Sequence, residues 1–139
     1  MVFENLSALV LAGGAGRRMG GLDKGLVVYN GLPLVSHSIA IVKAHTKNIF
    51  VNANRNIEKY QQFGFPVLPD LSQEKLGPLA GIQVGLSVCK TDLLMVISCD
   101  TPNLPNNLIP KLYDRLNKLN VDIAIPYSLE EKTNKKRTH

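Results

Sequence analysis

Short apolar runs typical of β-strands alternate with helical segments from one end of the chain to the other. Because parallel strands need crossover helices, this alternation predicts an α/β protein with three α/β/α layers and a mostly parallel sheet. The expected strands are residues 7–11, 48–53, 66–69, 93–98 and 122–126. The expected helices are residues 34–44, 55–63, 79–89 and 106–119, with a short strand at 26–30 and a turn at 31–34.

The length and the apolar content fit one domain. With 139 residues and 45% hydrophobic side chains, the chain can bury a single core, which we assign to residues 1–129. Residues 130–139, EEKTNKKRTH, are polar and charged, and this composition predicts a disordered tail.

The charge balance favours a small anionic ligand. The net charge is +5 and tryptophan is absent, so the basic stripes and aromatic platforms of a nucleic-acid partner are not expected. The first residues, MVFENLSALVLAGG, have no basic leader region and their apolar run soon meets glycine. We therefore expect a cytoplasmic protein with no signal peptide and no membrane span. Cys89 and Cys99 have no metal-ligand spacing and are expected to be buried thiols.

A glycine-rich segment, LAGGAGRRMGGLDKG at residues 11–25, directly follows the first apolar run. Glycine lets a ligand approach the main chain closely, so successive N–H groups can converge on phosphate oxygens. Arg17, Arg18 and Lys24 add positive charge, and together these features predict a seat for a nucleoside triphosphate. The alternative is a plain surface loop, which rarely carries three cations directly after a buried strand.

Two common phosphate motifs do not fit this segment. A Walker A loop needs a hydroxyl residue after its lysine, and Lys24 stands in D-K-G. The dinucleotide fingerprint fails because Met19 occupies its third glycine position.

Polar residues end or follow three further strands, at the sheet edge where ligands of parallel α/β proteins bind. Asn52 offers an amide for ribose or base. Asp70 is a natural acceptor for the paired N–H groups of guanine, its alternative being a turn residue after proline. Asp100 follows the apolar run LLMVIS and is expected to bind Mg²⁺ together with phosphate oxygens; a turn or cap role is the alternative.

The catalytic candidates are Arg18, Lys24 and Asp100. Lys24 would reach phosphate as a point charge and Arg18 bidentately, which would offset charge on the transferred and leaving groups. Solvation is the alternative for each cation, and it is the favoured interpretation for Arg17.

Two further segments have local interpretations. GPLAG at residues 77–81 is a tight turn that opens a helix, and a base lying on this backbone and simple helix-start chemistry are equally compatible with it. Asn54 is expected to cap the helix at residues 55–63, and Tyr60 to be a core or rim residue.

The motifs LAGGAGRRMGGLDKG, VNAN, PD at 69–70, GPLAG and CDTP at 99–102 together resemble the molybdenum cofactor guanylyltransferases. The resemblance runs in order from about residue 7 to residue 126. It implies a Rossmann-like nucleotidyltransferase fold and an enzyme that uses GTP and Mg²⁺. Such an enzyme transfers GMP to the terminal phosphate of molybdenum-loaded molybdopterin and releases pyrophosphate.

The resemblance also implies individual roles. Lys24 corresponds to the triphosphate lysine, Asn52 and Asp70 to nucleoside contacts, and Asp100 to a position that contacts both GTP and magnesium. The implied backbone and base-side contacts are Leu11, Ala12, Gly13 and Gly14, and Gly77, Pro78, Leu79 and Gly81.

Members of this family typically continue into a second half that supplies much of the molybdopterin surface, so the acceptor half is expected to be largely missing here. Expected protein partners are other molybdenum cofactor biosynthesis proteins or recipient molybdoenzymes. The alternatives are a CTP-dependent or sugar-phosphate nucleotidyltransferase of the same fold, and a shortened GTP-binding protein without catalysis. Leu11-Ala12-Gly13-Gly14 favours guanine, because cytidylyl relatives tend to show LAAG there.

Overall fold

The computed structural model describes residues 1–13, 23–71, 77–129 and 136–138. Contacts divide the chain into two compact units, Met1–Leu104 and Pro105–His139. The first unit carries the parallel sheet and nearly all of the predicted site. Gly14, Arg17 and Arg18 lie outside the described residues.

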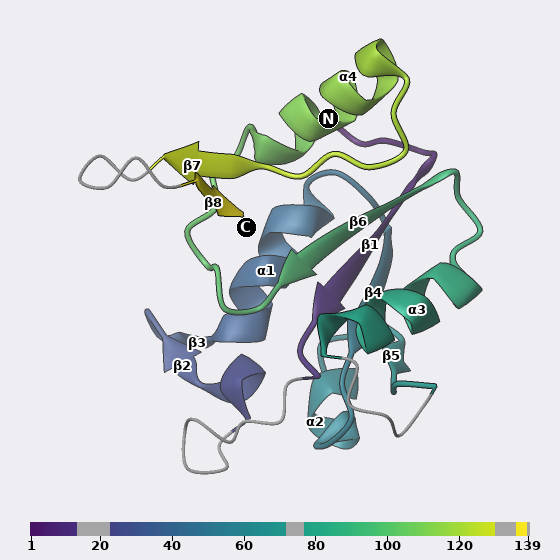
Figure 1. Ribbon diagram of the computed structural model, residues 1–139. Helices are drawn as coiled ribbons and strands as arrows, with labels where there is room; N and C mark the ends of the chain where they lie inside the picture. Colours follow the sequence, from purple (N-terminus) through teal and green to yellow (C-terminus); the bar gives the residue numbers. More distant parts are fainter. Residues whose placement is uncertain (14–22, 72–76, 130–135, 139) are drawn as a thin grey trace. The chain divides into compact units, whose positions relative to one another are not determined.

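The first unit is built on a four-stranded parallel sheet, in the order β5-β4-β1-β6 (Figure 1). This confirms the prediction of an α/β protein with a mostly parallel sheet. The strands are β1 (Leu6–Leu11), β4 (Asn48–Asn52), β5 (Val67–Leu68) and β6 (Leu93–Ser98).

The register aligns the carboxyl ends of these strands. Leu11 pairs with Asn52 on one side and with Ser98 on the other, and Asn52 pairs in turn with Leu68. The chain moves outward from β1 to β4 and β5 and then returns to place β6 on the other side of β1. The loops after β1 and β6 therefore flank the point where the strand order reverses, which is where doubly wound sheets bind ligands.

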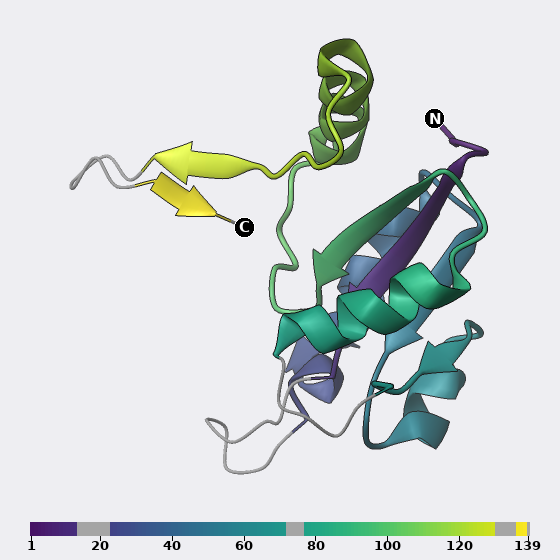
Figure 2. The same cartoon turned by 45° about the vertical axis from the view of Figure 1, so that its right-hand side comes forward.

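Helices α1 (Leu34–Lys43) and α3 (Pro78–Val88) cover opposite faces of the sheet (Figure 2). Side chains alternate along β1, so Leu9 and Leu11 lie against α3 while Val10 faces the α1 side. Leu9, Val10, Val35, Val42 and Val51 are all fully buried and form the centre of the core.

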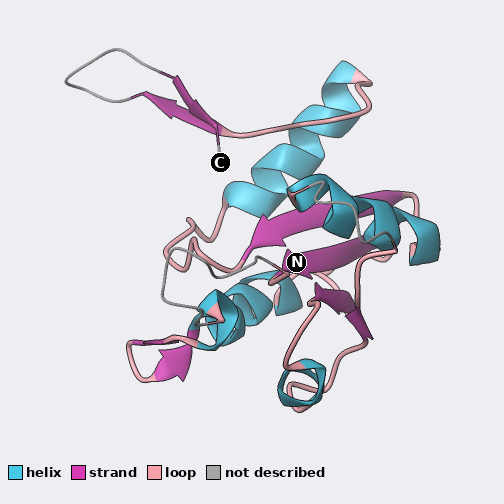
Figure 3. Ribbon diagram, turned by 60° about the horizontal axis from the view of Figure 1, so that its bottom comes forward, coloured by secondary structure: helices cyan, strands magenta, loops and turns pink. Residues whose placement is uncertain are grey.

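The remaining elements of this unit are short. Helix α2 (Ile57–Gln61) lies between β4 and β5 in sequence, and a 3₁₀ helix (Lys24–Leu26) precedes an antiparallel hairpin of β2 (Val28–Tyr29) and β3 (Leu32–Pro33), which Figure 3 shows apart from the main sheet. Where the sequence predicts a strand at 26–30 and a turn at 31–34, the turn thus lies earlier, at Asn30 and Gly31. Both have positive φ, 48° and 82°, as hairpin turns with the native twist require.

The second unit contains α4 (Leu108–Leu119) and a hairpin of β7 (Tyr127–Leu129) and β8 (Lys136–Thr138). The predicted strand at 122–126 is wrong, because the structure begins a strand only at Tyr127 and pairs it antiparallel with β8. Pro126 has no N–H to donate, so ladder pairing starts after it. β8 lies within residues 130–139, for which the composition predicts disorder. Its backbone hydrogen bonds with β7 depend on a pairing partner, which composition alone does not reveal.

The predicted helices are all present, with bounds within about two residues of those expected. Among the described residues, no helix combines the length and apolar character needed to cross a membrane.

Candidate functional site

The carboxyl end of β1 lies between its two neighbouring strands and ends in bare main chain. The Ala12 N–H donates to the Asn52 carbonyl (2.8 Å), and the Leu11 carbonyl accepts from the Cys99 N–H (3.2 Å). At Gly13 an added Cβ would lie 2.7 Å from Asn52 Oδ1 and 2.9 Å from Asn54 Nδ2, so only glycine leaves these two amides in place. Leu11, Ala12 and Gly13 are therefore at the sheet edge where the sequence predicts them.

Two asparagines hold the carboxylate of Asp70. Asn52 Nδ2 donates to Asp70 Oδ1 (2.9 Å) and to the Leu68 carbonyl (3.0 Å), with only 3% of Asn52 exposed. Asn54 Nδ2 donates to Asp70 Oδ2 (3.0 Å) and the Asp70 N–H returns a bond to Asn54 Oδ1 (2.7 Å). A carboxylate has about four acceptor positions, so Asp70 is fixed in orientation and still has acceptor capacity for a ligand.

The network shows that the helix-capping prediction for Asn54 is wrong. Its side chain donates to the Gly13 carbonyl (3.3 Å) as well as to Asp70, and the residue at the start of α2 is Asn56, at φ 53° with no side-chain cap bond. The spacing of Asn52 and Asn54 is the signal that was missed, because residues two apart in an extended chain share a face.

Helix α3 reaches the same edge through Gly81. A Cβ there would lie 2.5 Å from Asn52 Oδ1 and 2.6 Å from Leu11 Cδ2. Gly77 precedes the helix at φ 60°, Pro78 is its first residue, and Leu79 is 67% exposed. Of the predicted base-side residues, Gly81 thus contacts the Asn52 side chain, whereas Gly77, Pro78 and Leu79 form an exposed helix start.

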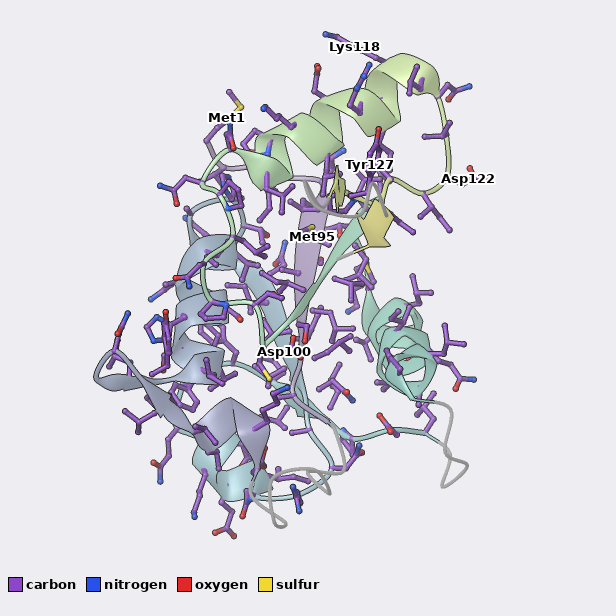
Figure 4. The ribbon with its side chains drawn as sticks, turned by 60° about the vertical axis from the view of Figure 1, so that its left-hand side comes forward. Met1, Met95, Asp100, Lys118, Asp122 and Tyr127 are labelled. Atoms are coloured by element: carbon purple, nitrogen blue, oxygen red, sulfur yellow. The ribbon has the colours of Figure 1, made fainter. Side chains whose placement is uncertain are left out.

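On the other side of β1, Lys24 and Asp100 form an ion pair. Lys24 Nζ donates to Asp100 Oδ2 at 3.2 Å, and the two side chains are 51% and 42% exposed. Figure 4 shows Asp100 just beyond the end of the β6 ribbon. The two predicted catalytic residues that the structure describes are therefore brought together across 76 positions of sequence.

Ser98 supplies the other hydrogen bond to this carboxylate. Ser98 Oγ donates to Asp100 Oδ1 at 2.6 Å. This bond, and then the bond and charge of Lys24, lower the pKa of Asp100 despite partial burial. Asp100 is consequently ionised at neutral pH, as a metal ligand must be.

The donor set at Asp100 fits Mg²⁺ held jointly with a nucleotide. Within the described ranges no cluster of three or more His, Cys, Asp or Glu side chains is present, so these residues alone form no complete metal site there. Magnesium is usually bound by one or two carboxylates, with substrate phosphates and water completing its coordination. A half-exposed, ionised Asp100 matches that pattern.

A further contact was not visible in the sequence. Tyr60 is fully buried, which confirms its placement in the core, and its hydroxyl donates to Asp23 Oδ1 at 2.5 Å. The partner lies 37 positions away, so no local pattern reveals it.

The two cysteines differ in burial. Both are free thiols, Cys99 buried as predicted and Cys89 only half-buried. Burial, and then the neighbouring Asp100 charge, raise the pKa of Cys99 to about 11, so the thiol stays protonated at neutral pH.

Sequence comparison gives one family and closely similar relatives. A family model described as the MobA-like NTP transferase domain matches residues 8–134. The molybdenum cofactor guanylyltransferase of Ralstonia nicotianae is 42% identical over 131 residues, which cover 94% of this chain and 64% of that protein. The protein of the same name from Albidiferax ferrireducens is 44% identical over 124 residues, covering 88% of this chain and 59% of the relative. The chain thus spans about 60% of the length of these curated relatives.

Solved structures confirm the Rossmann-like nucleotidyltransferase fold. Molybdopterin-guanine dinucleotide biosynthesis protein A from Archaeoglobus fulgidus matches with a TM-score of 0.65 and 21% identity, over 94% of this chain and 65% of its own. A CMP:2-keto-3-deoxy-manno-octonic acid synthetase complexed with CTP matches with a TM-score of 0.66 and 19% identity, over 88% of this chain and 50% of its own.

Proposed function

This chain belongs to the family of MobA-like NTP transferase domains, and from that premise we propose that it is the GTP-binding part of a molybdenum cofactor guanylyltransferase. The reaction transfers GMP from GTP to the terminal phosphate of molybdenum-loaded molybdopterin and releases pyrophosphate. One observation carries the proposal. At the carboxyl end of β1, the Asp70 carboxylate, fixed by hydrogen bonds, lies on the β4 side, and the Lys24–Asp100 ion pair lies on the β6 side.

The nucleoside belongs on the β4 side of β1 in this proposal. Asp70 accepts the paired N–H groups of guanine, because Asn52 and Asn54 hold its carboxylate rigid and leave acceptor positions open. Asn52 thereby orients the base reader, and its side-chain oxygen Oδ1 lies next to Gly81. The α3 start, Gly77 to Leu79, is exposed on the same edge and offers apolar surface to the base.

The triphosphate belongs between the end of β1 and the 3₁₀ helix. Gly13 has no side chain, so in this proposal a phosphate group approaches the main chain there, beside Leu11 and Ala12, and Lys24 donates to the phosphate oxygens. Gly14 and Arg18, outside the described residues, complete this set as predicted phosphate ligands.

Asp100 would hold Mg²⁺ when GTP is bound. Bound there, the ion would neutralise charge on the phosphate oxygens. In the free chain the ammonium of Lys24 lies on the same carboxylate oxygen, at 3.2 Å. Lys24 therefore has to leave Asp100 for phosphate when the metal–nucleotide complex enters.

The attacking group is a phosphate oxygen that is already anionic at neutral pH, so the site needs no strong general base. Among the described residues the two histidines on or beside α1 are occupied elsewhere: His37 hydrogen-bonds to the Tyr29 carbonyl and His45 to that of Met1. The chain's contribution to rate is thus positioning and charge neutralisation by Lys24 and the main chain.

Binding of the acceptor, molybdopterin, is proposed for a longer protein than this chain. Because the chain spans about 60% of its curated relatives, molybdopterin binding and contacts with other cofactor-biosynthesis proteins or recipient molybdoenzymes are proposed for the full-length counterpart in the cytoplasm. Nucleotide binding is proposed for this chain itself.

Calorimetric titration of the chain with GTP, CTP and ATP, each with Mg²⁺, tests the binding step. GTP is expected to bind most tightly, and tighter binding of CTP would overturn the assignment of Asp70 as a guanine reader. Pyrophosphate release upon addition of molybdopterin tests the transfer step. GTP binding without release would leave this chain a binding role only.

A further inference from the structure

Helix α2 holds the residue that directly precedes Lys24. Tyr60 donates its hydroxyl to Asp23 Oδ1 (2.5 Å), and Asn56 Nδ2 donates to Asp23 Oδ2 (3.1 Å). Both carboxylate oxygens of Asp23 are therefore bound by α2 and the residue that precedes it. Lys24 instead extends to Asp100.

The segment after Asp23 is a closed turn. The Leu26 N–H donates to the Asp23 carbonyl (3.0 Å), and the Val27 N–H donates to the Lys24 carbonyl (3.2 Å). Asp23 thus fixes the turn through its main chain and anchors it to α2 through its side chain. The backbone from which the Lys24 side chain extends is held at both points.

Gly25 seats this turn directly on the Tyr60 ring. It is buried, and an added Cβ would lie 3.2 Å from Tyr60 Cε1 and Cζ and would collide with the hydroxyl oxygen. Tyr60 itself is fully buried. Its burial, and then the bond to Asp23, raise the pKa of the hydroxyl well above its ordinary range, so it remains a hydrogen-bond donor at working pH.

We propose that Asp23, clamped by Tyr60 and Asn56, is a positioning residue that presents Lys24 to the phosphates of the bound nucleotide. The inference rests on the proposed function, because it takes Lys24 as a phosphate ligand. Its physical basis is pre-organisation: a lysine on a fixed turn loses less conformational freedom on binding than one on a loose loop. None of the three clamp residues needs to touch the ligand.

Tyr60→Phe removes one hydroxyl and keeps the ring beneath Gly25. Tyr29→Phe is the matched control, since the Tyr29 hydroxyl also has one side-chain partner, Asn103 at 3.1 Å, but lies outside the clamp. Calorimetry with Mg²⁺ and GTP, and with guanosine alone, separates the phosphates from the base. Tyr60→Phe is expected to weaken GTP binding by about tenfold, the size of one hydrogen bond to a charged group, and to leave guanosine binding unchanged. Tyr29→Phe is expected to change neither.

A double mutant tests whether Tyr60 acts through Lys24. If it does, Tyr60→Phe adds nothing further in a Lys24→Met background, whereas independent effects would add. Should Tyr60→Phe fail to fold by circular dichroism, Asn56→Gly removes the second clamp bond and suits the positive φ of 53° at that position.

The outcomes are distinguishable. Equal weakening of GTP and guanosine, or full additivity with Lys24→Met, would assign Tyr60 a purely structural role and overturn the inference. Unchanged GTP binding in the clamp variants would overturn it while leaving the proposed function standing. No GTP binding by the unaltered chain would overturn both.

Discussion

Substitution of Lys24 by methionine should raise the affinity of the free chain for a divalent metal ion and lower its affinity for GTP. Methionine keeps a long apolar side chain but removes the ammonium that lies 3.2 Å from Asp100 Oδ2. In the free chain the ion pair is about half exposed, and such pairs contribute only about 0.2–1 kcal/mol to stability after solvent screening. The thermal midpoint should therefore change little.

The free carboxylate should bind a divalent ion more readily once the competing ammonium is gone. The metal no longer has to break the exposed ion pair, which contributes at most about 1 kcal/mol, so its affinity should rise by up to about fivefold. Mn²⁺ is a suitable probe, because carboxylates bind it as they bind Mg²⁺ and its effect on water-proton relaxation reports binding.

GTP affinity should fall in the same variant. A hydrogen bond to a charged group contributes about 1.5–3 kcal/mol, part of which the unaltered chain spends on breaking the Asp100 pair. The net loss is about 1–2 kcal/mol, or a 5- to 30-fold weaker affinity for GTP with Mg²⁺ by calorimetry. Lys118→Met is the matched control, because Lys118 forms an ion pair with Asp114 at 3.0 Å on α4. It should change neither affinity. If Lys24→Met weakened the binding of both Mn²⁺ and GTP, or of neither, Lys24 would not be the residue that exchanges Asp100 for phosphate.

Three further variants, and Gly85→Ala as a control, test other parts of the site. In Gly81→Ala the new Cβ would lie 2.5 Å from Asn52 Oδ1. The free energy of unfolding in chemical denaturation should therefore fall by about 1–3 kcal/mol, less any gain in helix propensity, and GTP binding should weaken. Gly85→Ala, whose Cβ would lie 2.7 Å from Leu9 Cδ2, should lower stability alone; equal effects of the two on binding would contradict the site. Ser98→Ala should raise the pKa of Asp100, measured by carbon NMR, because the Ser98 bond is the largest cause of its lowering. Since the folded pKa lies below the unfolded value of about 3.9, the ionised carboxylate stabilises the fold above that value, and the stabilisation is lost as pH falls through the folded pKa. The variant should lose part of this acid resistance, and an unchanged titration would contradict the assignment. Asp70→Asn should reduce the preference for GTP over ATP in competition binding, and an unchanged preference would remove Asp70 as base reader.

The alternation of strands and helices was readable from the sequence because short apolar runs alternate with helical segments, and some helices have a boundary signal such as Gly64 or Pro78. The same reasoning wrongly predicted a strand at residues 122–126. Its apolar residues fit a strand, but pairing depends on which other segment offers a partner, and Tyr127 finds β8 beyond the expected end of the domain. Local propensity does not contain that information.

The site shows the same division. The convergence of Asn52, Asp70 and Asp100 was predictable because residues that end or follow parallel strands meet at one edge, and the register confirms that alignment for β1, β4, β5 and β6. The role of Asp23 was not, since its partner Tyr60 lies 37 positions away and nothing nearby in the sequence indicates the contact. For Asn54 the spacing from Asn52 was a usable signal, but its partner Asp70 lies 16 positions away.

A crystal structure of the chain with Mg²⁺ and a non-hydrolysable GTP analogue tests the central claim most directly. We expect the phosphates between Gly13 and Lys24, the metal on Asp100 and the guanine edge on the Asp70 carboxylate. Nucleotide bound away from the carboxyl ends of the strands, or with its base beside Asp100 and its phosphates at Asp70, would show that the proposed GTP site is wrong.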